Sequence, residues 1–73
     1  MNPYYVIDGI DRQMSAFLTA KILAKEGNSP VDCLRHLLSK GYEFPDAKWA
    51  VIHGLKLSRK AIKQMVSDYD GSY

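Results

Sequence analysis

Apolar residues in the last third of the chain recur with the spacing of one helical face. The repeat, at i, i+3, i+4 and i+7 with one further position, consists of Ala61, Ile62, Met65, Val66 and Tyr69. Ser58 precedes it as a candidate N-cap, and polar residues fill the opposite side. The pattern predicts an amphipathic helix over residues 58–69.

A longer apolar run predicts a first helix that ends at about Lys25. Asp8 or Asp11 is placed to cap its start, and the sequence EGNSP ends it. Its apolar residues lie almost all round the helix axis: Met14, Ala16, Phe17, Leu18, Ala20, Ile22, Leu23 and Ala24. A helix that is apolar on most sides is normally covered on more than one of them. We expect this helix at the centre of the fold or in a subunit interface.

The start of a second helix is marked by three consecutive features. Ser29 is a candidate N-cap, Pro30 suits the first helical position, and Asp32 favours the first turn. Gly41 is a candidate C′ residue that ends the helix. Its apolar side consists of Val31, Cys33, Leu34, Leu37 and Leu38. These features predict a helix from Pro30 to just before Gly41.

A third helix is predicted from Pro45 to near Gly54, since proline suits a first turn. The amino-terminal stretch YYVIDGI is rich in residues that favour strands and predicts a short strand or an ordered arm. The expected fold class is all-α, a compact bundle of about four short helices with this strand or arm in front. Residues 1–73 form a single domain.

The small size of the chain limits its core. A domain of 73 residues has a small core and marginal stability, and its lone Cys33 has no disulfide partner within the chain. We therefore expect a homodimer. The unpaired cysteine favours a reducing compartment, the cytoplasm. No apolar run approaches the roughly 18 residues of a membrane span, and the amino terminus does not resemble a signal peptide.

Few residues are candidates for catalysis or metal binding. Cys33 and His36 are three apart, but they fall on opposite faces of the second predicted helix. Asp8 and Asp11 form a carboxylate pair whose simpler role is helix capping. The cysteine and the two histidines lack zinc-ligand spacing. We expect no enzyme activity, no cofactor and no metal.

Positive charge is concentrated near the carboxyl end. The formal net charge is only +2, yet residues 47–67 hold five cations and no acid. The candidate binding residues are Lys48, Lys56, Arg59, Lys60, Lys63 and Gln64. A solvated basic face is the simplest explanation. The cations stand in the first turns of the last predicted helix, however, where the helix dipole favours acids.

The sequence AKWAVIHGLKLSRKAIKQM resembles a helix-turn-helix, with Ala50 and Gly54 four apart. The resemblance implies that the second helix of the pair enters the major groove of double-stranded DNA. Arg59, Lys60 and Lys63 would then contact phosphates or guanine edges, and Gln64 would contact adenine. The remaining cations, Lys48 and Lys56, would add phosphate contacts.

A second resemblance covers residues 4–38. The sequence YYVIDGIDRQMSAFLTAKILAKEGNSPVDCLRHLL resembles a ribbon-helix-helix, and Gly27, Ser29, Leu34 and Arg35 match its junction and following helix. This family forms an intertwined dimer from one strand and two helices.

The expected function is a small dimeric DNA-binding transcriptional regulator that uses the basic helix near its carboxyl end. The alternative is a protein-interaction module, an inhibitor or adaptor, that binds an acidic protein surface through the same basic face with Tyr4 and Tyr5.

Overall fold

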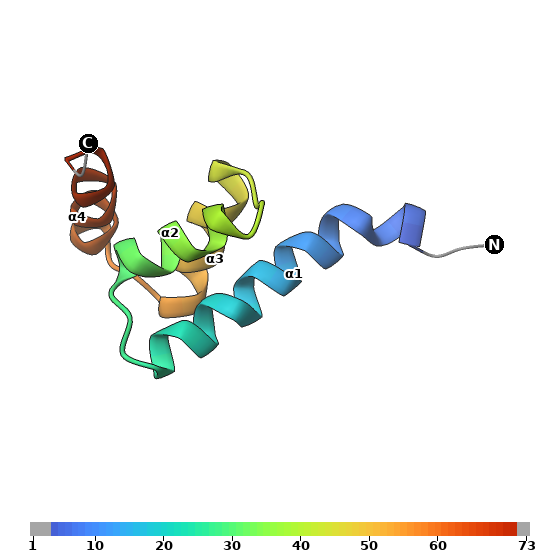
Figure 1. The fold of residues 1–73 in the computed structure, drawn as a ribbon, viewed down its shortest axis with the longest axis horizontal. Helices are drawn as coiled ribbons and strands as arrows, with labels where there is room; N and C mark the ends of the chain where they lie inside the picture. The colour runs from blue at the N-terminus through green and yellow to red at the C-terminus, as the bar shows by residue number, and fades with distance from the viewer. Residues whose placement is uncertain (1–3, 72–73) are drawn as a thin grey trace.

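The longest helix, α1 (Tyr4–Lys25), packs against two of three shorter helices in the computed structural model, and the last helix packs on the second (Figure 1). The three shorter helices are α2 (Pro30–Ser39), α3 (Phe44–Leu55) and α4 (Arg59–Asp70). The structure describes the backbone of residues 4–71 and the side chains of residues 11–71, and it has no strand within that range. The predicted all-α bundle of four helices is confirmed.

The start of α1 differs from the sequence prediction. The helix already includes Tyr4, so neither Asp8 nor Asp11 caps it, and Asp11 lies exposed in its interior. Residues 4–10 are therefore helical, not a strand or arm. A single strand without a partner leaves its backbone groups unpaired, whereas a helix satisfies them internally, so β propensity does not decide the conformation here.

Two parts of the sequence interpretation depended on this stretch. The ribbon-helix-helix likeness requires a strand over residues 4–10, where the structure has the first turns of α1. The side chains of Tyr4 and Tyr5 lie outside those that the structure describes.

Both ends of α2 form as the sequence predicts. The Ser29 hydroxyl accepts a hydrogen bond of 3.3 Å from the Asp32 N–H, and Pro30 is the first helical residue. At the other end Gly41 adopts a φ of 100°, and the Tyr42 N–H donates to the Leu37 carbonyl at 3.2 Å. This is a Schellman motif, which requires a residue that tolerates positive φ.

The third helix begins one residue before the predicted Pro45 and ends one residue after Gly54. Lys56 follows it with φ of 54° and ψ of 52°, in the left-handed region. Its backbone N–H donates to the Ile52 carbonyl, as does that of Leu57 at 3.0 Å. A lysine therefore occupies a turn position where glycine is usual.

The core lies where α1, α2 and α3 meet. Its buried apolar residues are Ala16, Ala20, Leu23, Cys33, Leu34, Leu37, Ala47, Ala50, Val51 and Met65. Only one side of α1 contributes to this core, through three small or medium side chains, and the opposite side remains open. The prediction that α1 is covered on several sides is thus only partly met within one copy of the chain.

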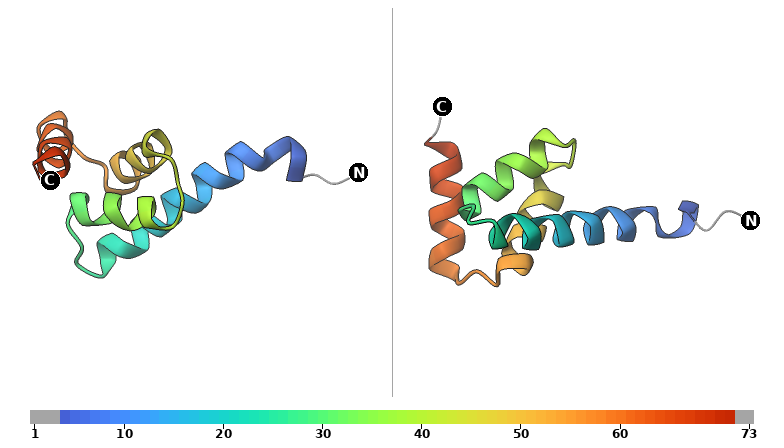
Figure 2. Two further views of the ribbon diagram at one scale, coloured as in Figure 1. Left: turned by 45° about the horizontal axis from the view of Figure 1, so that its top comes forward. Right: turned by 60° about the horizontal axis from the view of Figure 1, so that its bottom comes forward.

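The outer helix α4 packs mainly on α2, and Met65 is its buried residue. The rings of Phe44 and Tyr69 meet with centroids 5.5 Å apart, which joins the end of α4 to the start of α3. The amino-terminal half of α1 extends beyond the other three helices (Figure 2), and the longest dimension is 45 Å. None of the described helices combines the length and apolar character that crossing a bilayer requires.

Candidate nucleic-acid interface

The fourth helix starts with a side-chain cap and no acid. Ser58 is the N-cap, and its hydroxyl accepts a hydrogen bond of 3.2 Å from the Ala61 N–H. The first turn holds Arg59 and Lys60, and Lys63 follows one turn later. The amino end of α4 therefore combines the positive end of the helix dipole with three cations.

The predicted division of α4 into two faces is confirmed. The side that carries Arg59, Lys60, Lys63, Gln64 and Ser67 is exposed. The other side contains the buried Met65 and four half-buried residues, Ala61, Ile62, Val66 and Tyr69. The packing of the apolar stripe thus turns the cations toward solvent.

These cations are not neutralised by neighbouring acids. In the range 11–71, where side chains are described, no carboxylate lies within 4.0 Å of Arg59, Lys60 or Lys63. The acids of α4, Asp68 and Asp70, stand in its last turn, where the helix dipole favours cations. Both ends of α4 therefore carry the charge that the dipole disfavours, at a cost of about 0.3–1 kcal/mol per group.

Gln64 is already engaged within the helix. Its Nε2 donates to Asp68 Oδ1 at 2.8 Å across one turn. A contact of this amide with an adenine edge would require that hydrogen bond to break.

The residues that join α3 to α4 bring one more cation to this end of the molecule. Lys56 is exposed at the carboxyl end of α3, and only Lys56, Leu57 and Ser58 separate the two helices. A short connection of this kind is what the helix-turn-helix likeness expects. We call Lys56, Arg59, Lys60 and Lys63 the basic surface.

Lys48 does not belong to this group. It lies two turns before Lys56 on α3, about 12 Å away along the helix axis, and it is half-buried. Its separation from the other predicted site residues follows from its place near the start of α3.

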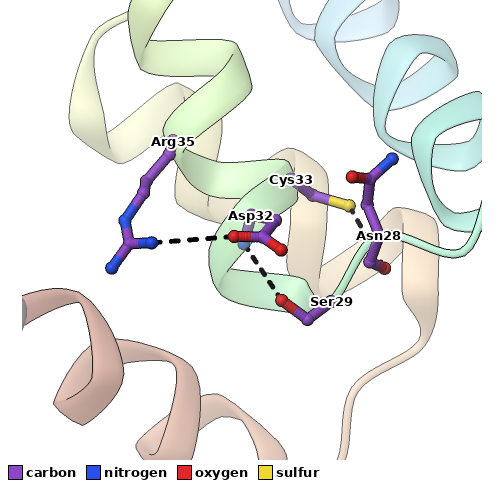
Figure 3. Close-up of polar contacts among 5 residues, drawn as sticks. All are labelled: Asn28, Ser29, Asp32, Cys33 and Arg35. Atoms are coloured by element: carbon purple, nitrogen blue, oxygen red, sulfur yellow. Dashed lines mark hydrogen bonds and ion pairs between the residues drawn. The ribbon is translucent and has the colours of Figure 1, made fainter.

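The other candidate reactive residues, Cys33 and His36, do not come together in the structure. Cys33 is buried and its Sγ points to the Asn28 carbonyl oxygen at 3.9 Å, while His36 is exposed (Figure 3). Burial raises the pKa of the Cys33 thiol above its ordinary value, and the neighbouring Asp32 carboxylate raises it further. A raised pKa makes a thiol a poor nucleophile at neutral pH.

The Asp32 carboxylate is also engaged, because it forms an exposed ion pair with the Arg35 guanidinium at 3.6 Å (Figure 3). Within the described part of the chain, no group of three or more potential ligands is placed to hold a metal ion, and no pocket is present.

One exposed apolar surface, on α1, was not predicted from the sequence. Met14, Leu18 and Ile22 were counted among the apolar residues of the first helix, and the structure leaves them 51%, 51% and 58% exposed. Their spacing of four residues would have identified a shared face.

Comparison of the chain with protein-family models, with curated proteins and with solved structures found no match.

Proposed function

We propose that the chain is a small DNA-binding regulator that contacts the phosphates of double-stranded DNA through its basic surface. The observation that carries the proposal is the group of exposed cations at the amino end of α4. These cations lack carboxylate neighbours among the described side chains, and they stand where the helix dipole adds to their positive potential.

Phosphate is the ligand that this arrangement suits best. Backbone N–H groups and the dipole at a helix amino terminus favour anions, and lysine and arginine side chains add charge. Contacts of this kind supply affinity without sequence preference. The cost of placing cations against the dipole is recovered when an anion binds there.

Sequence preference would come from Arg59 and Gln64. An arginine forms bidentate hydrogen bonds with guanine and a glutamine with adenine, each worth about 1–3 kcal/mol of discrimination. Both side chains lie on the exposed half of α4, within its first two turns. This is the part of a recognition helix that contacts base edges in a helix-turn-helix.

We also propose an oligomeric state and a cellular compartment for this regulator. The regulator acts as a homodimer, because α1 exposes the large apolar side chains of Met14, Leu18 and Ile22, and two copies would double the number of phosphate contacts. Its unpaired, buried Cys33 suits the reducing cytoplasm.

The test is the salt dependence of binding to random duplex DNA, measured by fluorescence anisotropy. Each phosphate contact contributes about 0.9 to the magnitude of the log–log slope. Lys60→Ala and Lys63→Ala should each lower the slope by about 0.9 and the double variant by about 1.8. The matched control is Lys40→Ala, which removes an exposed lysine from the end of α2 and should leave the slope unchanged.

Either of two results would reject the proposal. One is a wild-type chain that does not bind DNA at low salt. The other is a Lys60→Ala/Lys63→Ala double variant that keeps the wild-type slope. The inhibitor or adaptor alternative would be supported if the wild-type chain bound an acidic protein but not DNA, and if the double variant lost that binding.

A further inference from the structure

The open side of α1 carries a row of large apolar side chains. Met14, Leu18 and Ile22 follow one another at intervals of four residues and are each at least half exposed. They lie opposite the buried Ala16, Ala20 and Leu23, which face α2 and α3. When the lower side of the molecule is turned toward the viewer, α1 lies in front of the other helices with no element over it (Figure 2, right).

The row is symmetric about Leu18, and so are the charges at its ends. Met14 and Ile22 stand four residues to either side of Leu18, and Asp11 and Lys25 stand seven residues to either side. Positions separated by three, four and seven residues share one face of a helix. Along this face an acidic residue, three apolar residues and a basic residue follow one another, with Leu18 at the midpoint.

Such a face is complementary to itself when two copies meet antiparallel. The two Leu18 side chains then face each other at the two-fold axis, and Met14 of one copy faces Ile22 of the other. Asp11 of one copy faces Lys25 of the other at both ends. A parallel arrangement would instead place like charges opposite each other.

From this symmetry we infer that α1 pairs with α1 of a second copy of the chain, antiparallel and centred on Leu18. Two-fold homodimers require a self-complementary surface, and this face meets that requirement in the order of its apolar and charged positions.

The flanking residues Ser15 and Lys21 are engaged within one copy, since Ser15 shares a hydrogen bond of 2.7 Å with the Tyr42 hydroxyl and the Lys21 ammonium lies over the Phe17 ring. The register therefore depends on Leu18, on the Met14 and Ile22 positions and on the two charged ends. Met14, Leu18 and Ile22 are exposed, and α2 and α3 pack on the side of α1 that carries Ala16, Ala20 and Leu23.

The inference does not rest on DNA binding, and its test uses the protein alone. Sedimentation equilibrium across the micromolar range should give a mass near twice 8.3 kDa for the wild-type chain. Leu18→Lys should give the mass of one chain, because two like charges would meet at the axis. All changed side chains are exposed, so circular dichroism should show folded variants.

Charge reversal tests the register. Asp11→Lys alone and Lys25→Asp alone should each weaken the dimer at least several-fold, because each places like charges opposite each other at both ends. The double variant Asp11→Lys/Lys25→Asp should recover the wild-type dissociation constant. An equimolar mixture of the two single variants should form a heterodimer in which both ion pairs are favourable.

A wild-type mass of one chain at all concentrations would overturn the dimer. A dimer that Leu18→Lys leaves intact would show that the copies meet elsewhere. Failure of the double variant to recover affinity, with Leu18→Lys still disruptive, would overturn the antiparallel register.

Discussion

Gly54 of α3 lies directly against Ala20 of α1, where the two helices cross. A Cβ atom placed on Gly54 would come within 3.2 Å of the Ala20 Cβ and within 3.3 Å of the Phe17 carbonyl oxygen. The second of these neighbours is backbone and cannot turn aside. The absence of a side chain at Gly54 therefore sets how closely α3 approaches α1.

This contact predicts the effect of enlarging residue 54. Gly54→Leu should lower the free energy of unfolding by about 1–3 kcal/mol, since overpacking forces the helices apart. Gly54→Ala should change it much less, because alanine gains about 0.8–1.0 kcal/mol of helix propensity over glycine while it crowds Ala20. Urea denaturation measures both. A leucine variant as stable as the wild type would show that the crossing is loose.

The left-handed conformation of Lys56 allows its charge and its backbone strain to be tested separately. A non-glycine residue in this region costs about 1–2 kcal/mol. Lys56→Gly should relieve part of this cost and stabilise the fold by about 0.5–1 kcal/mol. Lys56→Ala keeps the strain and should not raise stability.

Both substitutions remove the same charge. Each should therefore lower the salt slope of DNA binding by about 0.9 if Lys56 contacts a phosphate. Thermal unfolding and anisotropy on the two variants separate the effects. Equal stabilities in the two variants would mean that the turn is not strained.

The buried thiol predicts how stability changes in alkali. The pKa of Cys33 is raised in the folded chain above the ordinary value of 9.0, so the unfolded chain loses the proton first as pH rises. The stabilisation from the protonated thiol is thus complete below pH 9.0 and declines above it, by at most about 1.4 kcal/mol per pH unit.

The measurement is the free energy of unfolding from pH 8 to about 10.5, compared between the wild type and Cys33→Ala. The two proteins differ only at residue 33, so the difference in slope isolates the thiol. Parallel curves would contradict the predicted contribution of Cys33.

The hydrogen bond between Gln64 and Asp68 predicts a variant that binds DNA more tightly. Asp68→Ala removes an acid from α4 and releases the Gln64 amide. The loss of one helix-surface pair and the relief of an acid in the last turn nearly cancel, so stability should change by no more than about 0.5 kcal/mol. Anisotropy should show a lower dissociation constant on random duplex DNA. Unchanged or weaker binding would indicate that α4 does not face the phosphates.

Residues that act through local geometry were predictable from the sequence. Ser29, Gly41 and Ser58 mark helix ends because their side chains or torsion angles satisfy groups only a few residues away. The exposed basic half of α4 followed from apolar periodicity for the same reason. Neither Asp8 nor Asp11 caps α1, which already includes Tyr4, and the β-forming residues there gave the wrong conformation.

Features that depend on where distant segments pack were not predictable. Whether Leu18 lies in the core or at the surface depends on the side of α1 against which α2 and α3 fold. The half-buried position of Lys48 likewise depends on how α3 packs. Periodicity defines faces, but it does not say which of two apolar faces the rest of the chain covers.

Trp49 is the single tryptophan of the chain, and its surroundings make it a built-in optical reporter. Its indole lies 6.2 Å from the Phe17 ring of α1 and 4.7 Å from the His53 ring, measured between ring centroids, and it is 38% exposed. Its emission therefore follows the opening of the α1–α3 crossing, whereas far-ultraviolet dichroism follows all the helices. Coincident transitions from the two signals would show that the chain unfolds as one cooperative unit, without any attached dye.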